Sequence, residues 1–329
     1  MNDDRFLDDA RRDPRPEFAR GLRERLRSEE TPSSGRAWAG LGVRPALVGT
    51  FAVIAAVALF TLPSVRASAQ AFLDLFRVRS FAAVSFDPER LKRLESAKLD
   101  VKELLGGQIE TLKETGAPRA VGSASEAGAI AGFVARQPSY LPSGFVADSA
   151  FVQGDGAARI TIRGDKVRTV LDALDIHDLQ LPPGLDGKTA TVRVSPAVFL
   201  RYRHGDNRLA LAQSRSPEVD LPPGIDLPTL GEIGLRILGL GPAEAKRIAQ
   251  TTDWHTTVLV PVPTDASSFQ QVDVNGNRGL LIETTERSNA KDGGRHAGSV
   301  LLWSDGDMVF ALTGRLNRVD LVQMASSVR

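Results

Sequence analysis

The sequence predicts an α+β protein, with one transmembrane helix followed by a mostly antiparallel sheet domain and its covering helices. Two observations predict this class. An apolar run without charged residues occupies positions 45–65. Within residues 128–329, segments with a strand-like pattern alternate with segments that have a helical pattern. The chain has 329 residues, of which 42% are hydrophobic, so it is long enough for about two ordinary domains with a buried core.

Composition excludes several kinds of chemistry. Lys and Arg (41) almost balance Asp and Glu (40), so we expect no basic face and no direct nucleic-acid partner. Cysteine is absent, which excludes disulfides, thiolate metal sites and cysteine nucleophiles. The four histidines show no metal-ligand spacing; they are His177, His204, His255 and His296. We therefore expect no bound metal and no cofactor.

Residues 1–43 form a charged segment with one periodic stretch. Phe18, Leu22 and Leu26 recur every four residues, which predicts a short amphipathic helix with one apolar stripe. Two interpretations are open. An isolated helix of this length frays in water. Alternatively, the stripe is a partner-binding site that docks on another protein.

The apolar run from Pro45 to Val65 predicts a transmembrane helix within residues 44–66. Its 21 residues would span about 31 Å as a helix, close to the roughly 30 Å hydrocarbon core of a bilayer. A buried core helix and a signal peptide cleaved after Ala69 are the alternatives. As a first apolar segment, the run would place the N-terminus in the cytoplasm and the C-terminal domain outside it.

Residues 67–127 are expected to hold juxtamembrane helices and a linker. The apolar side chains of 67–81 predict a helix, lying on the membrane surface or packed in the fold. Asp87-Pro88 begins a second predicted helix that runs to about Leu105, with Ile109 and Leu112 as a possible extension. Residues 115–127 have the composition of a loop.

The predicted extracytoplasmic α+β domain comprises residues 128–329. Alternating apolar residues predict strands at 158–164, 189–195, 199–204, 256–262, 270–274, 279–284, 299–304 and 308–314. Asn275-Gly276 and Asp305-Gly306 predict tight hairpin turns. Helices are predicted at Lys166–Leu174, from Gly241-Pro242 to about Gln250, and near Arg318–Ser327. Helices set between hairpins favour a sheet covered on one face.

A short motif recurs at intervals of 40 residues. LPSGF begins at Leu141, LPPGL at Leu181 and LPPGI at Leu221. This spacing is compatible with an internal repeat, but the intervening segments do not match one another. The second interpretation is a shared turn chemistry, because Pro-Gly pairs commonly precede strands.

No catalytic motif emerges from the sequence, and we expect no enzyme. GDGAAR (154–159) and DGKTAT (186–191) lack the ending of a phosphate-binding loop and predict hairpin turns instead. Asp253-Trp254-His255 has the residue types of a catalytic group, but no serine accompanies it. We expect Trp254 to fill the edge of the core and His255 to be exposed.

Several segments together resemble the extracytoplasmic domain of bacterial single-pass membrane proteins related to anti-sigma factors. QPSYLPSGF (137–145) resembles the opening of that domain, and residues 239–263 resemble its helix-then-strand segment. VDVNGNRGLLIET and SVLLWSDGDMVFALTG resemble its terminal hairpins, and LVQMASSV its closing helix. The chain departs from zinc-containing anti-sigma domains, which use a histidine with paired cysteines.

This resemblance implies a membrane regulator. The outer domain would sense an envelope signal, and the helix around Phe18, Leu22 and Leu26 would bind a sigma factor or another cytoplasmic protein. The alternative hypothesis is an envelope-anchored binding module for lipid, peptide or polysaccharide. A deep apolar groove would favour the second hypothesis.

Overall fold

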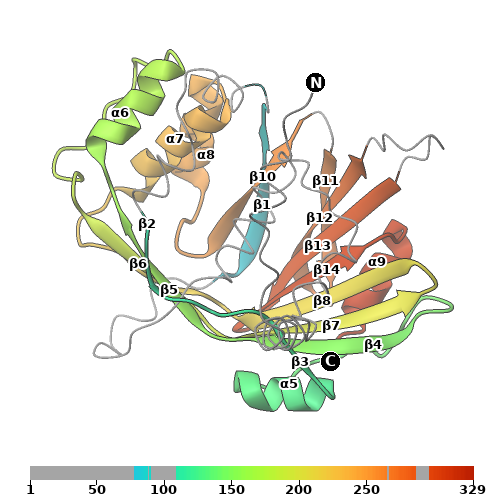
Figure 1. The fold of residues 1–329 in the computed structure, drawn as a ribbon. Coiled ribbons are helices and arrows are strands. Elements are labelled where there is room, and N and C mark those ends of the chain that lie inside the picture. The colour runs from blue at the N-terminus through green and yellow to red at the C-terminus, as the bar shows by residue number, and fades with distance from the viewer. Residues whose placement is uncertain (1–77, 88, 90–108, 265–266, 287–295) are drawn as a thin grey trace, which may run out of the picture. The chain divides into compact units, whose positions relative to one another are not determined.

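The computed structural model describes residues 78–87, 89, 109–264, 267–286 and 296–329. All of them belong to one compact unit that spans Pro45–Arg329. Strands predominate among these residues, so the protein is mostly β (Figure 1).

An eight-stranded antiparallel sheet is the centre of the fold. Its strands, in spatial order, are β11 (Ser267–Val274), β12 (Asn277–Glu286), β13 (His296–Asp305), β14 (Met308–Gly314), β8 (Asn207–Arg215), β7 (Ala197–His204), β4 (Val146–Gln153) and β3 (Arg119–Val121). Three hairpins, β11–β12, β13–β14 and β7–β8, account for much of this order. At both edges of the sheet, the paired strands are close together in the sequence. The pairing of β14 with β8 in the middle of the sheet, in contrast, joins segments about 100 residues apart.

Three strands of this sheet continue into a second, four-stranded sheet. Its order is β2 (Ile109–Lys113), β5 (Gly156–Thr161), β6 (Thr189–Val194) and β9 (Glu218–Asp220). Two residues separate β4 from β5, β6 from β7, and β8 from β9, and Figure 1 shows β5 and β6 as continuations of β4 and β7. Pro196 and Pro217 lie in two of these connections, where the missing backbone N–H interrupts the ladder.

Helices cover one face of the eight-stranded sheet. We call this the outer face; it carries Val198, Leu200, Leu211 and Leu312. Packed against it are α5 (Ala124–Ala131) through Ala127 and α9 (Arg318–Ser326) through Leu321 and Met324, all of them buried. The C-terminus is joined to the fold here, because Gln137 and Arg329 exchange two backbone hydrogen bonds of 3.0 and 3.1 Å.

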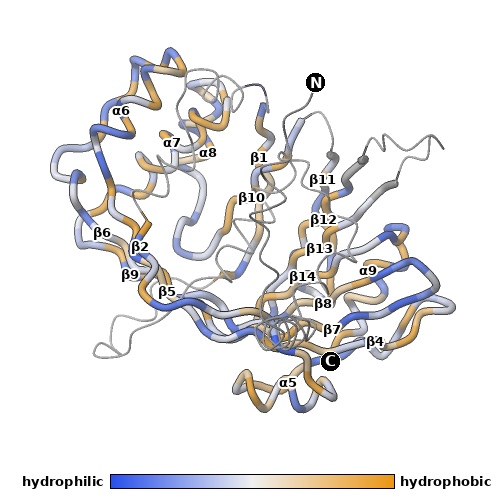
Figure 2. The backbone as a smooth tube through the Cα atoms, viewed as in Figure 1, coloured by the Kyte–Doolittle hydropathy of each residue, from blue (hydrophilic) through white to orange (hydrophobic). Residues whose placement is uncertain are grey.

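A pair of parallel strands covers part of the opposite, inner face. β1 (Ser80–Phe86) and β10 (Thr257–Pro263) pair along their whole length. Phe81 and Val260 pack against Leu280 and Leu302 of the sheet. Figure 2 shows hydrophobic stretches on these facing elements.

Beyond β1 and β10 lie three helices: α6 (Gly164–Ala173), α7 (Leu227–Leu238) and α8 (Pro242–Thr251). α7 joins two apolar clusters, since Leu235 packs with Val84 of β1 while Ile233 packs with Leu171 of α6. The sheet is therefore covered on both faces, and not on one face as the sequence predicted.

Many elements expected from the sequence are confirmed. The strand predicted at 308–314 has the bounds of β14, and α6, α8 and α9 lie within two residues of the predicted helices. Asn275 and Gly276 both adopt positive φ, +53° and +79°, and join β11 to β12 as predicted. Asp305-Gly306 joins β13 to β14.

The predicted α+β class with a transmembrane helix is wrong. Strands outweigh helices, and no helix in the described part of the chain is long and apolar enough to cross a membrane. The longest of these helices, α7, has 12 residues, so it spans about 18 Å against the roughly 30 Å required. The run 45–65 from which the prediction came lies outside the described residues.

Other predictions are wrong because the segments concerned pair with strands that are distant in the sequence. The end of the predicted helix 67–81 is strand, since Ser80 and Phe81 pair with β10. Ile109 does not extend a helix; it pairs with Ile160 in the four-stranded sheet. The predicted loop 115–127 contains β3 and the start of α5.

The recurring Leu-Pro-x-Gly segments share a turn and not a structural unit. Gly144, Gly184 and Gly224 adopt φ of +81°, +80° and +72°, as the third position of a type II turn requires. The elements after these turns differ: β4 comes after the first, β6 after the second and α7 after the third. The turn-chemistry interpretation is the one that fits.

A candidate apolar ligand pocket

One row of side chains crosses the inner face of the eight-stranded sheet. In register, and therefore side by side, lie Phe199 of β7, Ala212 of β8, Ala311 of β14 and Leu302 of β13. The two central residues are alanines, and their neighbours are large. Opposed residues in an antiparallel pair have Cβ atoms about 5 Å apart, so two facing alanines leave a gap between larger side chains.

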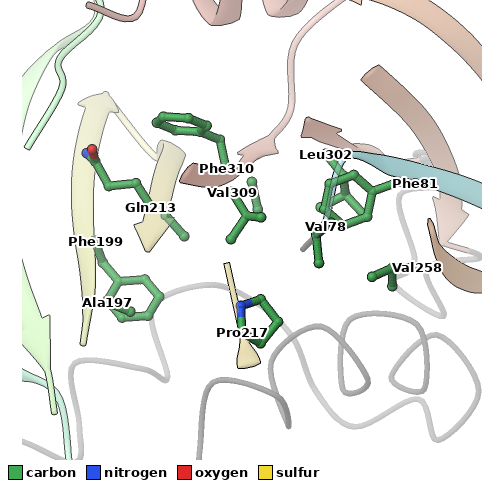
Figure 3. A pocket seen from close by; sticks show the side chains of 12 residues that line it. Val78, Phe81, Ala197, Phe199, Gln213, Pro217, Val258, Leu302, Val309 and Phe310 are labelled. Carbon is green, nitrogen blue, oxygen red and sulfur yellow. The ribbon is translucent and has the colours of Figure 1, made fainter. Parts of the chain in front are cut away.

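The covering strands do not fill this gap. Phe81 and Val78 approach from β1 and the residues before it, and Val258 from β10. Ala197, Val309 and Pro217 complete the walls (Figure 3). The cavity volume is about 40 Å³. By this measure a single water molecule needs roughly 10–15 Å³, so the end of an alkyl chain fits without rearrangement.

Gln213 is the one polar side chain among the described residues that line the pocket. It alternates with Ala212, and its amide lies away from the pocket centre (Figure 3). That amide bonds at both ends to the backbone of Arg136: Oε1 accepts from the N–H and Nε2 donates to the carbonyl, both at 2.8 Å. Among the described residues, every buried side-chain nitrogen and oxygen has a partner. A polar ligand would lose its hydrogen bonds to water here without replacement.

The covering strand is fixed where it enters the pocket. The backbone N–H of Val78 donates to the Ser216 hydroxyl at 2.8 Å, and the Ser304 hydroxyl donates to the Arg79 carbonyl at 2.7 Å. Ser216 precedes Pro217, which lines the pocket, so one wall of the pocket is joined to the other by a hydrogen bond. The cavity is therefore a preformed space.

A cationic region lies on the inner face near the pocket. Arg201 follows Phe199 by two residues on β7, and its Cζ lies 4.4 Å from the centre of the Phe151 ring. Burial lowers the pKa of the Arg201 guanidinium, while the nearby Asp148 carboxylate raises it. Arg203, two residues further on, forms an ion pair of 2.9 Å with Asp148.

Those residues singled out by the sequence that the structure describes do not line this pocket. Phe18, Leu22 and Leu26, the predicted partner-binding residues, lie outside the described residues. Trp254 fills the edge of the core as expected, donating to the Ala249 carbonyl at 2.8 Å, and His255 is exposed. Asp253 accepts hydrogen bonds from the His255 N–H and the Thr256 hydroxyl, which makes it a turn residue.

Sequence reasoning missed the residues that create the pocket. Strand β8 was not predicted, and an alanine within a strand gives no sign of what faces it. The available signal was the pair of short motifs LALAQS and VFALTG, in which small residues interrupt otherwise large apolar positions. Their juxtaposition depends on the register of β8 with β14.

In the part of the chain that the structure describes, no group of three or more His, Asp or Glu residues could hold a metal ion. Gly154-Asp155 of GDGAAR connects β4 to β5, which lie in different sheets, and the rest of the motif belongs to β5, so the predicted hairpin turn is wrong. Comparison with protein-family models, curated proteins and solved structures gives no match.

Proposed function

We propose that this protein is a binding module for a ligand with a hydrocarbon chain, whose end occupies the pocket above Ala212 and Ala311. The observation that carries the proposal is an apolar, preformed cavity between two layers of strands. Filling it with alkyl groups removes apolar surface from water, worth about 0.8 kcal/mol for each buried methylene.

The lining favours a hydrocarbon over a peptide or a polysaccharide. A peptide needs partners for its backbone N–H and C=O groups, but β7, β8 and β14 are interior strands whose backbone groups bond to their neighbours. A polysaccharide needs polar contacts for its hydroxyls, and Gln213, the one polar side chain in the described lining, already bonds to Arg136. An alkyl chain requires neither.

The regulator hypothesis stays a prediction. It depends on the resemblance to anti-sigma-factor-related proteins and on the stripe of Phe18, Leu22 and Leu26 as a site for a sigma factor or another partner. Nothing in the geometry of the described residues adds to it. The pocket could nevertheless serve either a carrier or a sensor, since both need a ligand site.

The test fills the pocket and measures alkyl binding. Binding of straight-chain alcohols from hexanol to dodecanol to the full chain is followed by calorimetry. We expect affinity to increase with chain length in the unmodified protein. Ala212→Leu and Ala311→Leu fill the gap from opposite strands, and each should weaken dodecanol binding at least about tenfold, or about 1.4 kcal/mol.

Ala243→Leu is the matched control, because it makes the same change at an exposed position of α8. It should bind dodecanol as the unmodified chain does. Two results would contradict the proposal: no alcohol binds to the unmodified protein, or both filled variants fold and bind dodecanol with unchanged affinity.

A further inference from the structure

The floor of the pocket continues in one direction along β8. Ala210 is the next residue after Ala212 on the inner face of the strand, going toward its N-terminus. Two small side chains in succession therefore leave space above this part of the sheet. A cavity of about 40 Å³ holds only the end of an alkyl chain. The rest of such a chain must leave the cavity, and the line of Ala212 and Ala210 offers a path of small side chains on the face that carries Arg201.

This path leads to Arg201. The register places Arg201 directly opposite Ala210, one step along the strands from the pair Phe199 and Ala212. Two residues of strand rise amount to about 7 Å. A chain that starts between Phe199 and Ala311 and runs over Ala210 therefore passes beside the guanidinium group after roughly five methylenes.

The chemistry of Arg201 suits an anionic group. Its Cζ lies 4.4 Å from the centre of the Phe151 ring, a cation–π contact that holds the group on this face, and a guanidinium group can bind a carboxylate or a phosphate in a bidentate manner. Burial already removes part of its water, as the lowered pKa indicates. A partly desolvated cation interacts with an anion more strongly than a fully exposed one does.

The surrounding charge has the same sign. Arg203 and Arg208 lie opposite one another on this face of β7 and β8. Arg208 donates to the Gly205 carbonyl at 2.6 Å, and Asp148 pairs with Arg203 at 2.9 Å. Among the described residues, Arg203 and Arg208 thus add two positive charges beside Arg201 at the end of the alanine path, and Asp148 adds one negative charge.

We propose that the ligand is an anionic amphiphile, with its alkyl chain in the pocket and its carboxylate or phosphate on Arg201. This inference rests on the proposed function of the pocket. It adds a head-group requirement that the apolar cavity alone does not impose.

The experiment compares head groups on one chain length. Dodecanoate, dodecyl phosphate, dodecanol and dodecyltrimethylammonium are titrated into the full chain below their micelle-forming concentrations. We expect both anions to bind roughly tenfold more tightly than dodecanol, and the cation to bind most weakly. Added salt should reduce this advantage, because it screens the charge on a partly exposed group. The two anions distinguish a fatty-acid-type head group from a phosphate.

The variants separate this inference from the proposed function. Arg201→Ala should lose the advantage of the anions while dodecanol binding is unchanged, which also shows that the fold is intact. Arg201→Lys retains the positive charge and should therefore keep part of the affinity advantage of the anions over dodecanol. Arg215→Ala, which removes the same charge from the outer face of β8, should bind like the unmodified protein.

Equal binding of dodecanol and both anions, or anion binding that Arg201→Ala leaves unchanged, would overturn the head-group assignment and leave the alkyl pocket standing. If none of the four compounds binds, both proposals fail.

Discussion

Gly231 and Gly234 lie three residues apart on α7 and have opposite surroundings. A Cβ on Gly231 would meet the Trp254 ring at 2.0 Å, whereas a Cβ on Gly234 would have no atom within 4 Å. Gly231 thus allows the Trp254 ring to lie against the helix backbone. The helix tolerates the low propensity of glycine there because the close contact needs it.

Gly231→Ala should therefore lower the free energy of unfolding by about 1–3 kcal/mol, since the ring or the helix must move. Gly234→Ala should raise it by about 0.5–1 kcal/mol, through helix propensity alone. Urea unfolding followed by circular dichroism measures both. Equal effects from the two substitutions would show that Trp254 does not pack closely against α7.

Helix α9 illustrates how an element is fixed at its start. The Asn317 side chain accepts a hydrogen bond from the Asp320 N–H at 2.9 Å, which caps the helix. Asp320 in turn accepts from the Tyr140 hydroxyl at 2.9 Å, and this contact raises the pKa of Tyr140. The cap thus lies beside the contact that joins α9 to the segment before β4.

Removing the cap with Asn317→Ala should lower the free energy of unfolding by about 1 kcal/mol, because the Asp320 N–H loses its acceptor. Asn317→Ser retains an oxygen that can cap the helix, and should recover most of the loss. Chemical denaturation of both variants and the unmodified protein measures the three free energies of unfolding. An alanine variant as stable as the serine variant would argue against the cap.

At the scale of the whole molecule, Arg236 connects the helices to the loop before β6. It is 7% exposed and donates to both oxygens of Asp178, at 2.7 and 2.8 Å. The hydrogen bond from Arg236 lowers the pKa of Asp178 below its ordinary 3.8. A depressed folded-state pKa stabilises the fold above the unfolded-state pKa, and that contribution is lost as pH falls through the folded-state value.

Asp178→Asn should therefore destabilise the protein near neutral pH, where the carboxylate is ionised. The difference from the unmodified chain should narrow as the pH falls below 3.8, because the unfolded chain then takes up a proton at Asp178, and it should disappear below the lower pKa of the folded state, where the native carboxylate is protonated as well. Asp175→Asn is the control: this exposed residue has φ of +56°, which asparagine tolerates. Unfolding free energies of all three proteins across the acid range measure the effect, and a difference that does not change with pH would contradict the assignment.

Local signals predicted a large part of the fold. The Asn275-Gly276 turn, the proline that opens α8 and the alternation in β14 are encoded within a few residues, and each element formed where the sequence indicated. Predictions failed where the partner is distant. Ser80–Phe86 became a strand because β10, about 180 residues away, pairs with it in parallel.

The sequence by itself determined the β11–β12 and β13–β14 hairpins, the approximate bounds of α6, α8 and α9, and the absence of cysteine chemistry, because these depend on backbone preferences and composition. Only the tertiary structure decided that Ala212 faces Ala311 and that Arg201 lies one step further along the same face. A shift of one residue in either pairing would turn those side chains to the opposite face, so the pocket depends on the register between distant strands, and no local pattern in the chain specifies that register.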